Sequence, residues 1–372
     1  MKKVILIVLN NFKNDSRVLK EAISLQNGNF NVRVVALYEE GVKEYEEIEG
    51  IKVHRIRLKS REWIKVRMVQ VFKYFELIYR LLKGYRDIDI IHCNDLETLP
   101  LGVILKKFNR KIKIVYDAHE YETETYYSKG IRKKIAQKLE LWLIKYADEV
   151  ITVSGMIADE YVKLYSIKRP TLVLNTPILQ NIKRENLFRE RFDISENSRI
   201  FLYQGALNRG RGIEMILETF RLLDRKSVII FMGYGVLENH IKKYTQEYDN
   251  IYLHEAVSPS RLLPYTSSAD FGISLIEDSC LSYRYCLPNK MFEYIMVGLP
   301  VIVSNLPEMA KVVKEYNIGV VAKEHSIDGL KEAIVEATNL NRDSISQNIK
   351  KVKEIYNWEK QEERLLGVYN GL

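Results

Sequence analysis

Residues 278–304 read DSCLSYRYCLPNKMFEYIMVGLPVIVS, a loop, a helix and a short apolar strand in immediate succession. Pro288 closes the loop, Asn289 and Lys290 begin the helix, and Glu293 follows one turn later. The free N–H groups at such a helix start can hold a phosphate, helped by the helix dipole. A glutamate one turn into the helix can accept hydrogen bonds from two ribose hydroxyls. A capped surface helix with a solvated glutamate explains these residues equally well.

The same alternation of strand and helix continues along the whole chain and forms two series. Short β-branched runs favour buried parallel strands in both series, at 4–9, 32–37, 88–93, 112–117 and 149–154, then at 200–204, 227–232, 250–253, 271–275, 301–304 and 319–321. Helical patterns such as 15–26 and 63–82 lie between them, and an amphipathic helix, 355–372, ends the chain. This alternation predicts two doubly wound α/β domains, 1–175 and 176–354. We expect ligands to bind between them, beyond the carboxyl ends of the strands.

Composition excludes several classes of protein. The 372 residues are 47% hydrophobic and 28% charged, which rules out a disordered chain, a collagen and a disulfide scaffold. The three cysteines, which include Cys280 and Cys286, form no CxxC pair and have no histidine cluster near them, so we expect a reducing compartment and no zinc. The apolar run near the start is too short for a signal peptide, and none reaches the roughly 18 residues that span a bilayer. We therefore expect a cytoplasmic protein.

The positive charge is concentrated in the first half of the chain. Residues 1–175 hold 32 basic and 23 acidic side chains, whereas 176–372 hold 25 and 26. The net charge of +8 is thus carried by the N-terminal half. Such a bias favours an anionic partner: a nucleic acid, a membrane surface or a phosphorylated substrate.

The segment LPNKMFEYIMVGLPVIVS, 287–304, closely resembles the nucleotide-sugar site of GT-B retaining glycosyltransferases of the family 4 type, in the group that makes surface polysaccharides or glycolipids. The resemblance implies two Rossmann-like domains facing across a cleft, with the final helix packed back on the first domain, and it assigns Glu293 to the donor ribose. The family usually has a second glutamate eight residues earlier, where this chain has Tyr285. That departure leaves the donor sugar undetermined, and we consider Asp278 or Ser279 as a replacement.

A second donor segment is FLYQGALNRGRGIE, 201–214, in which a Gly-rich turn presents Arg209 and Arg211. Two guanidinium groups there could hold a diphosphate through bidentate, charge-assisted hydrogen bonds. Arg211 matches the second member of the family's basic pair, and two solvated loop arginines are the alternative. Gly233 and Gly235 follow the strand at 227–232 and resemble the family's loop beside the nucleotide, although the third glycine of a dinucleotide fingerprint is missing.

A third donor segment, 254–274, resembles the stretch whose backbone contacts the nucleotide base. The resemblance places Ala256 and Val257 beside the ring, where their backbone could read a uracil edge. We therefore expect a UDP-sugar as the donor, although side chains do not reveal which base is bound.

In the N-terminal half, IVYDAHEYETE, 114–124, puts Asp117, His119 and Glu120 at the carboxyl end of a predicted strand, which is the active edge of a doubly wound sheet. The segment resembles the family's Asp-x-His-Glu pattern, whose histidine lies near the reactive face of the donor sugar. The resemblance therefore predicts that His119 hydrogen-bonds the sugar and makes these three the candidate catalytic residues. Without it, a lone histidine at a strand end is more often structural.

The first loop and helix, 9–25, read LNNFKNDSRVLKEAISL. They lack a Gly-rich turn, which argues against nicotinamide binding. Asp15 or Ser16 can cap the helix. The segment resembles the acceptor-side loop of the same transferases, which makes Asn11, Asp15 and Arg17 candidate acceptor-side residues, with capping alone as the alternative for Asp15.

We predict no metal and no cofactor, because the nucleotide-sugar is itself a substrate. The Asp87–Asp89 pair has the spacing of an Asp-x-Asp metal motif, but it runs directly into an apolar strand. Cys280 and Cys286 have no matching histidines. Both pairs are therefore expected to be structural.

Two basic segments interleave cations with apolar side chains, from Lys59 to Arg86 and from Lys129 to Lys138 within a helix that extends to 146. Such helices can lie on anionic lipid. Packing of their apolar faces on the sheet is the alternative. We expect the protein to be peripheral on the inner leaflet of the cell membrane, where it would reach a glycan or lipid-linked acceptor.

These residues and the resemblance together predict a hexosyl- or N-acetylhexosaminyltransferase that moves a sugar from a nucleotide diphosphate donor with retention. One alternative is a nucleotide-sugar epimerase of the same fold, which would consume its substrate without an acceptor. Another is a nucleic-acid-binding protein that uses the basic half. The chain has no recognisable nucleic-acid-binding module, so we expect no nucleic acid partner.

Overall fold

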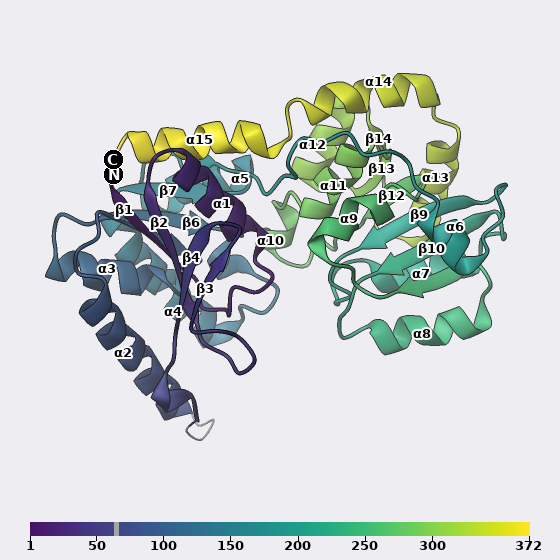
Figure 1. The fold of residues 1–372 in the computed structure, drawn as a ribbon. Helices are drawn as coiled ribbons and strands as arrows, with labels where there is room; N and C mark the ends of the chain where they lie inside the picture. Colours follow the sequence, from purple (N-terminus) through teal and green to yellow (C-terminus); the bar gives the residue numbers. More distant parts are fainter. Residues whose placement is uncertain (63–66) are drawn as a thin grey trace. The chain divides into compact units, whose positions relative to one another are not determined.

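The computed structural model describes the backbone of residues 1–62 and 67–372, and the side chains there except those of 61–71. Trp63 and the rest of 63–66, at the start of a predicted helix, lie outside the described residues. The chain forms two compact units: unit 1 comprises Met1–Val173 and Glu362–Leu372, and unit 2 comprises Leu174–Gln361. Each unit is a sheet of mainly parallel strands with helices on its two faces (Figure 1).

The sheet of unit 1 has the strand order β3-β4-β2-β1-β5-β6-β7-β8. Its strands are β1 (Lys3–Ile7), β2 (Asn31–Leu37), β3 (Tyr45–Ile48), β4 (Ile51–Ile56), β5 (Ile90–Asn94), β6 (Lys113–Ala118), β7 (Glu149–Thr152) and β8 (Thr171–Leu172). Val4 of β1 pairs with Val32 on one side and with Ile90 on the other. The chain leaves β1 toward β2 and later continues from β5 in the opposite direction, so the β1/β5 boundary is the switch point at which doubly wound sheets bind ligands.

The helices of unit 1 connect these strands. They are α1 (Ser16–Asn27), α2 (Arg67–Gly84), α3 (Leu99–Phe108), α4 (Gly130–Leu143) and α5 (Gly155–Tyr165), and α15 (Trp358–Asn370) enters the unit at Glu362. Helices α1 and α15 lie along one face of the sheet, and α2 and α3 along the other (Figure 1). The ring of Tyr369 in α15 packs edge-on against Phe30, with the ring centroids 5.4 Å apart.

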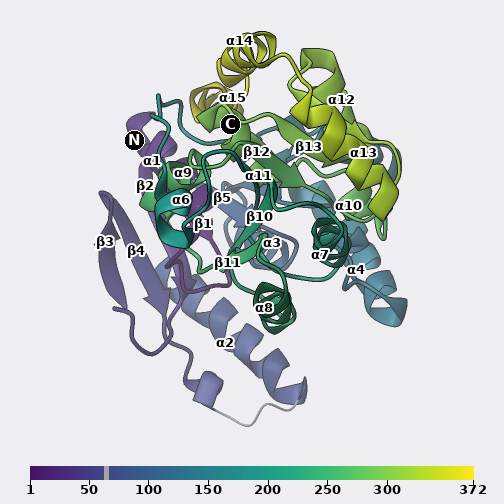
Figure 2. The ribbon, with the colours of Figure 1, turned by 90° about the vertical axis from the view of Figure 1, so that its right-hand side faces the viewer.

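The β3–β4 hairpin is absent from our sequence prediction. It joins the sheet at its edge, with Glu49 and Gly50 in the left-handed region at its turn (φ 49° and 82°). Figure 2 shows the hairpin at one side of unit 1 and α4 at the other. β3 was missed because it is an edge strand with none of its four residues buried, so it lacks an apolar run. β4 was missed although four of its six residues are buried, because Lys52, His54 and Arg55 interrupt its apolar positions.

The sheet of unit 2 is entirely parallel, in the order β11-β10-β9-β12-β13-β14. Its strands are β9 (Arg199–Gln204), β10 (Ser227–Met232), β11 (Ile251–His254), β12 (Phe271–Ser274), β13 (Val301–Ser304) and β14 (Gly319–Ala322). All six lie within a residue or so of the predicted runs. The switch point of this sheet is the β9/β12 boundary, where Phe271 pairs with Phe201.

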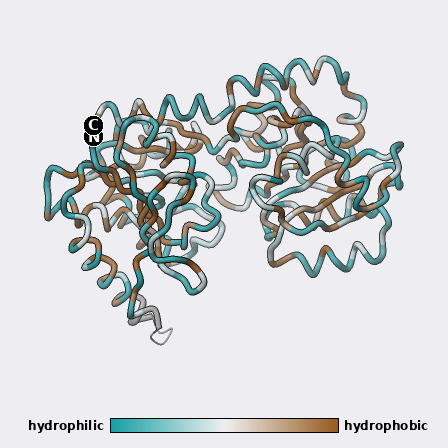
Figure 3. Tube along the Cα trace, in the orientation of Figure 1, coloured by the Kyte–Doolittle hydropathy of each residue, from teal (hydrophilic) through white to brown (hydrophobic). Residues whose placement is uncertain are grey.

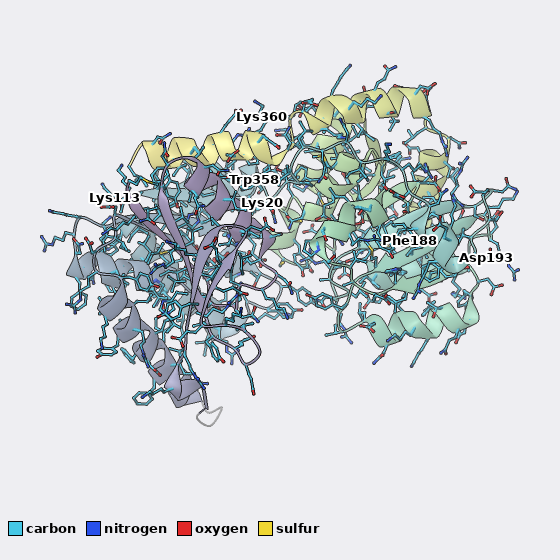
Figure 4. All side chains as sticks on the ribbon, in the orientation of Figure 1. Lys20, Lys113, Phe188, Asp193, Trp358 and Lys360 are labelled. Atoms are coloured by element: carbon cyan, nitrogen blue, oxygen red, sulfur yellow. The ribbon has the colours of Figure 1, made fainter. Side chains whose placement is uncertain are left out.

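The helices of unit 2 are α6 (Leu187–Phe192), α7 (Ile213–Arg221), α8 (Glu238–Glu247), α9 (Pro259–Thr266), α10 (Leu281–Arg284), α11 (Asn289–Val297), α12 (Pro307–Tyr316), α13 (Ile327–Thr338) and α14 (Arg342–Lys353). Helix α7 packs against α13, whereas α11 packs against α9 and α14. Hydrophobic residues gather on the strands inside each unit (Figure 3). Phe188 of α6 is buried inside unit 2, while Asp193, which ends this helix, lies at the outer edge (Figure 4).

No helix among the described residues is both long enough and apolar enough to cross a bilayer.

Candidate functional site

The carboxyl edge of the unit 2 sheet brings most of the predicted donor residues together. Glu293, one turn into α11, accepts a hydrogen bond from the Gln204 side chain at the end of β9, with Nε2 2.5 Å from Oε2. The Thr266 hydroxyl donates to the side-chain oxygen of Gln204, Oε1, at 2.7 Å, which fixes the orientation of the side-chain amide. The Glu293 carboxylate is therefore held at the sheet edge from the side, while it remains partly exposed.

Gln204 and Thr266 were not predicted as site residues. Gln204 is a buried polar residue that ends an apolar strand, and its backbone N–H donates to the Tyr294 hydroxyl at 3.1 Å. The polar end of an otherwise apolar run was the signal available in the sequence. Its partner Thr266 lies 62 positions further along the chain, and nothing in the pattern links the two.

Pro288 precedes α11, and among the described residues no side chain caps this helix end. The backbone N–H groups of Asn289 and Lys290 occupy the first two positions of the helix, where they have no intrahelical acceptor. The Lys290 ammonium lies 3.5 Å from the centroid of the Tyr203 ring. Burial and the nearby Arg211 hold the pKa of Lys290 well below its usual value. A bound anion would reverse that shift, so this lysine is suited to a phosphate.

The basic loop after β9 lies beside the same helix. The Arg211 guanidinium stacks over the ring of Tyr283 at 4.6 Å, which leaves its edge available for hydrogen bonds. Arg209 is exposed, whereas Arg211 is half-buried. Of the two predicted diphosphate ligands, Arg211 is therefore the one that packs on a neighbouring ring.

Two predicted glycines allow the loops to approach each other closely. A Cβ on Gly233 would lie 2.0 Å from the Gly205 carbonyl oxygen, and one on Gly235 would lie 2.5 Å from that of Leu207. Gly233 N–H also donates to the carbonyl oxygen of His254 at 3.2 Å. The loop that follows β10 therefore runs between those that follow β9 and β11 and needs glycine at both positions.

The remaining donor-side residues are less closely tied to this edge. Ala256 is exposed and Val257 half-buried, two and three residues past β11. Asp278 forms an ion pair with Arg284 at 2.6 Å, and Tyr285 directly follows α10. Asp278 and Ser279 are exposed. The idea that Asp278 or Ser279 replaces the missing glutamate stays a prediction.

In unit 1, His119 lies just past β6 between two carboxylates. Its Nε2 is 3.2 Å from Asp117 Oδ2, and its Nδ1 is 3.2 Å from Asp95 Oδ1. Burial opposes protonation, but the two carboxylates outweigh it and raise the pKa of His119 to about 9. The imidazole is thus a cation at neutral pH, with Nε2 hydrogen-bonded to Asp117 and Nδ1 in an ion pair with Asp95. Glu120, the third predicted residue of this segment, is exposed.

Asp117 is the centre of a buried polar cluster. Arg17 donates to both of its oxygens, with Nη2 2.9 Å from Oδ1 and 2.7 Å from Oδ2. Arg17 Nε is also 3.0 Å from Glu21 Oε1. Although burial acts in the opposite direction, Arg17 and His119 hold the pKa of Asp117 well below its usual range. Burial raises the pKa of Glu21 to about 8, so Glu21 is largely protonated at neutral pH.

This cluster also includes residues that were not predicted. His92 of β5 is fully buried, and burial lowers its pKa. Its Nε2 is 3.5 Å from Asp117 Oδ2, and its Nδ1 shares a 2.6 Å hydrogen bond with the Tyr369 hydroxyl of α15. Polar side chains therefore follow one another from the last helix of the chain to His119, although His92 Nε2 itself makes no hydrogen bond with any described residue. A buried histidine within the run IDIIHCN was the available signal.

The acceptor-side residues differ from one another in position. Asp15 is the N-cap of α1, because its carboxylate accepts from Val18 N–H at 3.2 Å. Asn11 donates to Glu39 at 2.6 Å and is half-buried. Arg17 is only 5% exposed, donates to Asp117 and to the Val173 carbonyl oxygen and lies beside Glu21, so it serves to position Asp117. Contact of these residues with an acceptor stays a prediction.

Candidate metal ligands occur together once among the described residues. Glu21, His92 and Asp117 each offer one atom, all within 4.8 Å of one another. Arg17 donates to both oxygens of Asp117 and lies 3.0 Å from Glu21, so it already supplies the positive charge that an ion would bring, and we assign no metal here. Both aspartates of the Asp-x-Asp pair contact Lys3 at the start of β1. Asp89 accepts a hydrogen bond from the backbone N–H of Lys3 at 2.7 Å, and Asp87 forms an ion pair with the Lys3 ammonium.

Comparison with known proteins agrees with this architecture. The model named "Glycosyltransferase Family 4" matches residues 17–178, and that named "Glycosyl transferases group 1" matches residues 184–352. An uncharacterized glycosyltransferase of Methanocaldococcus jannaschii is 24% identical over 295 residues, 73% of this chain and 68% of its own length. The chitobiosyldiphosphodolichol beta-mannosyltransferase of Kluyveromyces lactis is 22% identical over 354 residues, 84% of this chain and 77% of its own.

Solved structures show the same fold along the full chain. Sucrose-phosphate synthase of Thermosynechococcus elongatus has a TM-score of 0.82 at 15% identity, covering 100% of this chain and 99% of that one. HepE of Anabaena, solved with UDP and glucose, has a TM-score of 0.76 at 12% identity, covering 100% of both chains. At these identities the likeness concerns the fold alone.

Proposed function

Because this chain is a glycosyltransferase with the GT-B fold, we propose that it transfers a sugar from a UDP-sugar to a membrane-associated glycan or lipid-linked acceptor, with retention of anomeric configuration. The observation that carries the proposal is the carboxylate of Glu293, fixed by Gln204 one turn past the open N-terminus of α11. A carboxylate in that position suits a ribose diol, and the helix start suits the diphosphate attached to it.

In the proposed reaction, the bond between the sugar and the diphosphate breaks, and negative charge develops on the departing phosphate oxygen. Arg209, Arg211, Lys290 and the first N–H groups of α11 stabilise that charge in the transition state. Charge development also favours the protonated form of Lys290, whose pKa is held low before the anion arrives. The acceptor hydroxyl oxygen forms the new bond to the anomeric carbon as the bond to the diphosphate breaks. Its proton passes to the leaving phosphate oxygen, so neither a protein base nor a protein nucleophile is needed.

We propose that His119 hydrogen-bonds the transferred sugar, as the family resemblance implies. The Nε2–H of the protonated imidazole donates to Asp117, which holds the ring in one orientation. The Nδ1–H faces the half-exposed Asp95 carboxylate, and in the proposed complex a sugar hydroxyl takes the place of Asp95 at this nitrogen. Asp117 then acts as a positioning residue, and Glu120, being exposed, is the weaker catalytic candidate.

Two comparisons support the choice of donor and acceptor class. The Anabaena structure contains UDP and glucose, and the Kluyveromyces relative is named for a dolichol-linked acceptor. Those ligands belong to those proteins, and for this chain both assignments are proposals. An anionic membrane surface, on the inner leaflet in the cell, is the proposed partner of the basic segments from Lys59 to Arg86 and from Lys129 to Lys138.

The donor is tested by a thermal-shift screen of nucleotide sugars. A true donor present at 100 times its dissociation constant should stabilise the protein by about 2.7 kcal/mol. Glu293→Gln should abolish most of that stabilisation, whereas Glu336→Gln, an exposed position on α13, should leave it unchanged. Equal donor affinity in Glu293→Gln and wild type would contradict the assignment.

The reaction itself is tested with the donor so identified. Proton NMR of the product formed on a lipid-linked or glycan acceptor should show the donor's anomeric configuration. Donor that is consumed at the same rate without any acceptor, and returned as an epimer, would refute the transfer reaction.

A further inference from the structure

The helix α4 of unit 1 has its polar face buried and an apolar row exposed. Three tyrosine hydroxyls, from Tyr116, Tyr161 and Tyr165, donate to the buried carboxylate of Glu140 at 2.6, 2.8 and 2.5 Å. Nearer the start of the helix, Lys133 and Gln137 donate to Glu124 at 2.6 and 2.8 Å. The inward side of α4 is therefore held by hydrogen bonds to carboxylates.

The opposite side of the same helix carries large apolar residues. Ile131 is 77% exposed, Ile135 60% and Trp142 54%. With 3.6 residues per turn, positions 131, 135 and 142 fall on one side, opposite 133, 137 and 140. A surface helix normally buries its apolar stripe and exposes its charges. On α4, in contrast, the apolar row is exposed, and an exposed apolar row is typical of a surface that a binding partner covers.

The charges around this row indicate what the partner is. Arg132 and Lys134 are exposed on the flanks of the row, Lys138 is exposed on the same side of the helix as the row, and Lys145 follows just beyond the helix. The single acidic residue within α4, Glu140, is buried on the other side. Lys107 at the end of α3 lies over the Trp142 ring at 5.4 Å and adds another cation. An apolar row whose exposed charged neighbours on α4 are all cations matches an anionic lipid surface, which offers both acyl chains and phosphates.

A second apolar row lies in the same layer of helices. Phe72, Phe75 and Tyr79 of α2 are 56%, 62% and 62% exposed at a helical spacing. Helix α2 packs against α3, and α3 packs against α4. The outer side of this layer thus exposes aromatic and aliphatic residues from two of its helices.

We propose that α4 embeds its outward row, Ile131, Ile135 and Trp142, in the interface of an anionic bilayer, with its cations at the phosphates. This deepens the proposed function and rests on it only for the location of the acceptor. The buried Glu140 cluster fixes the rotation of α4, so the row is presented without refolding. Binding therefore has an apolar part, which resists salt, in addition to the electrostatic part that salt screens.

The test measures flotation of the full chain with vesicles of phosphatidylcholine containing 30% phosphatidylglycerol, and with phosphatidylcholine alone, at 0.1 and 0.5 M salt. We expect binding to the anionic vesicles that persists in part at high salt. The double variant Ile131→Glu/Ile135→Glu should lower the partition coefficient by about tenfold or more. The matched control Leu222→Glu/Val335→Glu places the same charges at exposed apolar positions of unit 2 and should bind as wild type does.

Four results would overturn the proposal. They are no flotation with anionic vesicles, binding that 0.5 M salt abolishes, equal loss in the control variant, and a wild-type dimer in light scattering that Ile131→Glu/Ile135→Glu converts to monomer. The last result would mean that a second copy covers the row. Thermal stabilisation by the donor is measured on the same proteins, and its retention in Ile131→Glu/Ile135→Glu would separate a failure of membrane binding from a failure of the proposed function.

Discussion

Replacement of Arg17 by methionine tests whether the cluster around Asp117 is held by one buried guanidinium. Arg17 makes its hydrogen bonds to both Asp117 oxygens and contacts Glu21, and each of the two acidic side chains is 0% exposed. Methionine fills a similar volume but leaves the Asp117 carboxylate without its main partner. Glu21 adds little to the loss because its pKa is about 8 and it is largely neutral at pH 7.

Removing one partner of a buried ion pair costs about 3–5 kcal/mol. The nearby His119 cation still compensates part of the Asp117 charge, so we expect a loss of about 3 kcal/mol in the free energy of unfolding of unit 1. For a unit of this size that is a fall in Tm of about 6–12 °C. Arg17→Lys keeps the charge but lacks the planar guanidinium. Its free energy of unfolding should lie between those of Arg17→Met and wild type.

The loss should depend on pH in a defined direction. In wild type the pKa of Asp117 is depressed, so its stabilising contribution is present at neutral pH and is lost as pH falls toward that low value. In Arg17→Met the pKa rises, and protonation relieves the unpaired charge at acid pH. The destabilisation should therefore be larger at pH 8 than at pH 5.

The measurement is urea unfolding of the full chain, with hydrogen exchange of β5 and β6 peptides to report on unit 1. Arg110→Met, at an exposed position before β6, is the control and should change stability by less than about 0.5 kcal/mol. A loss below about 1 kcal/mol in Arg17→Met, or one that does not vary between pH 5 and 8, would refute the reasoning.

Three further changes probe the site. Gln204→Leu should raise the dissociation constant of the donor by about tenfold in calorimetry, because Glu293 loses the hydrogen bond that orients it; wild-type affinity would contradict this. Asp95→Asn should lower the pKa of His119 in NMR titration. In wild type, protonated His119 stabilises the fold fully below about pH 6.5, and this stabilisation is lost as pH rises through about 9. In Asp95→Asn the same loss should occur at lower pH. Gly233→Ala should destabilise unit 2 by about 1–3 kcal/mol in urea unfolding, since its Cβ would meet the Gly205 carbonyl oxygen at 2.0 Å; a neutral result would argue against the close approach.

Much of the fold follows from the sequence because parallel strands buried on both faces appear as continuous apolar runs. The predicted run at 227–232 coincides with β10, and that at 301–304 with β13. The same reasoning missed β3, an edge strand without a buried residue, and β4, whose apolar positions are interrupted by charged and polar residues. It also placed the start of the last helix at 355, whereas α15 begins at Trp358.

The candidate site was only partly predictable, for a physical reason. Residues that touch a ligand follow strands in short motifs, as Glu293 and His119 do, and motifs can be found locally. Residues that hold those side chains come from other elements: Thr266 orients Gln204, and Tyr369 contacts His92 from a position 277 residues away. Only the folded topology brings such pairs together.

The helix α4 shows where periodicity stops being informative. Its sequence repeats apolar and charged residues at helical spacing, which is compatible with packing on the sheet and with exposure to a membrane, and five cations within residues 129–138 favour the membrane. Which side of α4 faces the sheet depends on Glu140, the single acidic residue of the helix. Its carboxylate accepts hydrogen bonds from three tyrosine hydroxyls of β6 and α5. A carboxylate that accepts three hydrogen bonds can be buried at little cost, and it turns Ile131 and Trp142 outward. Arg132, Lys134 and Lys138, which belong to the positive excess of residues 1–175, then lie around an exposed apolar row and form one surface with it.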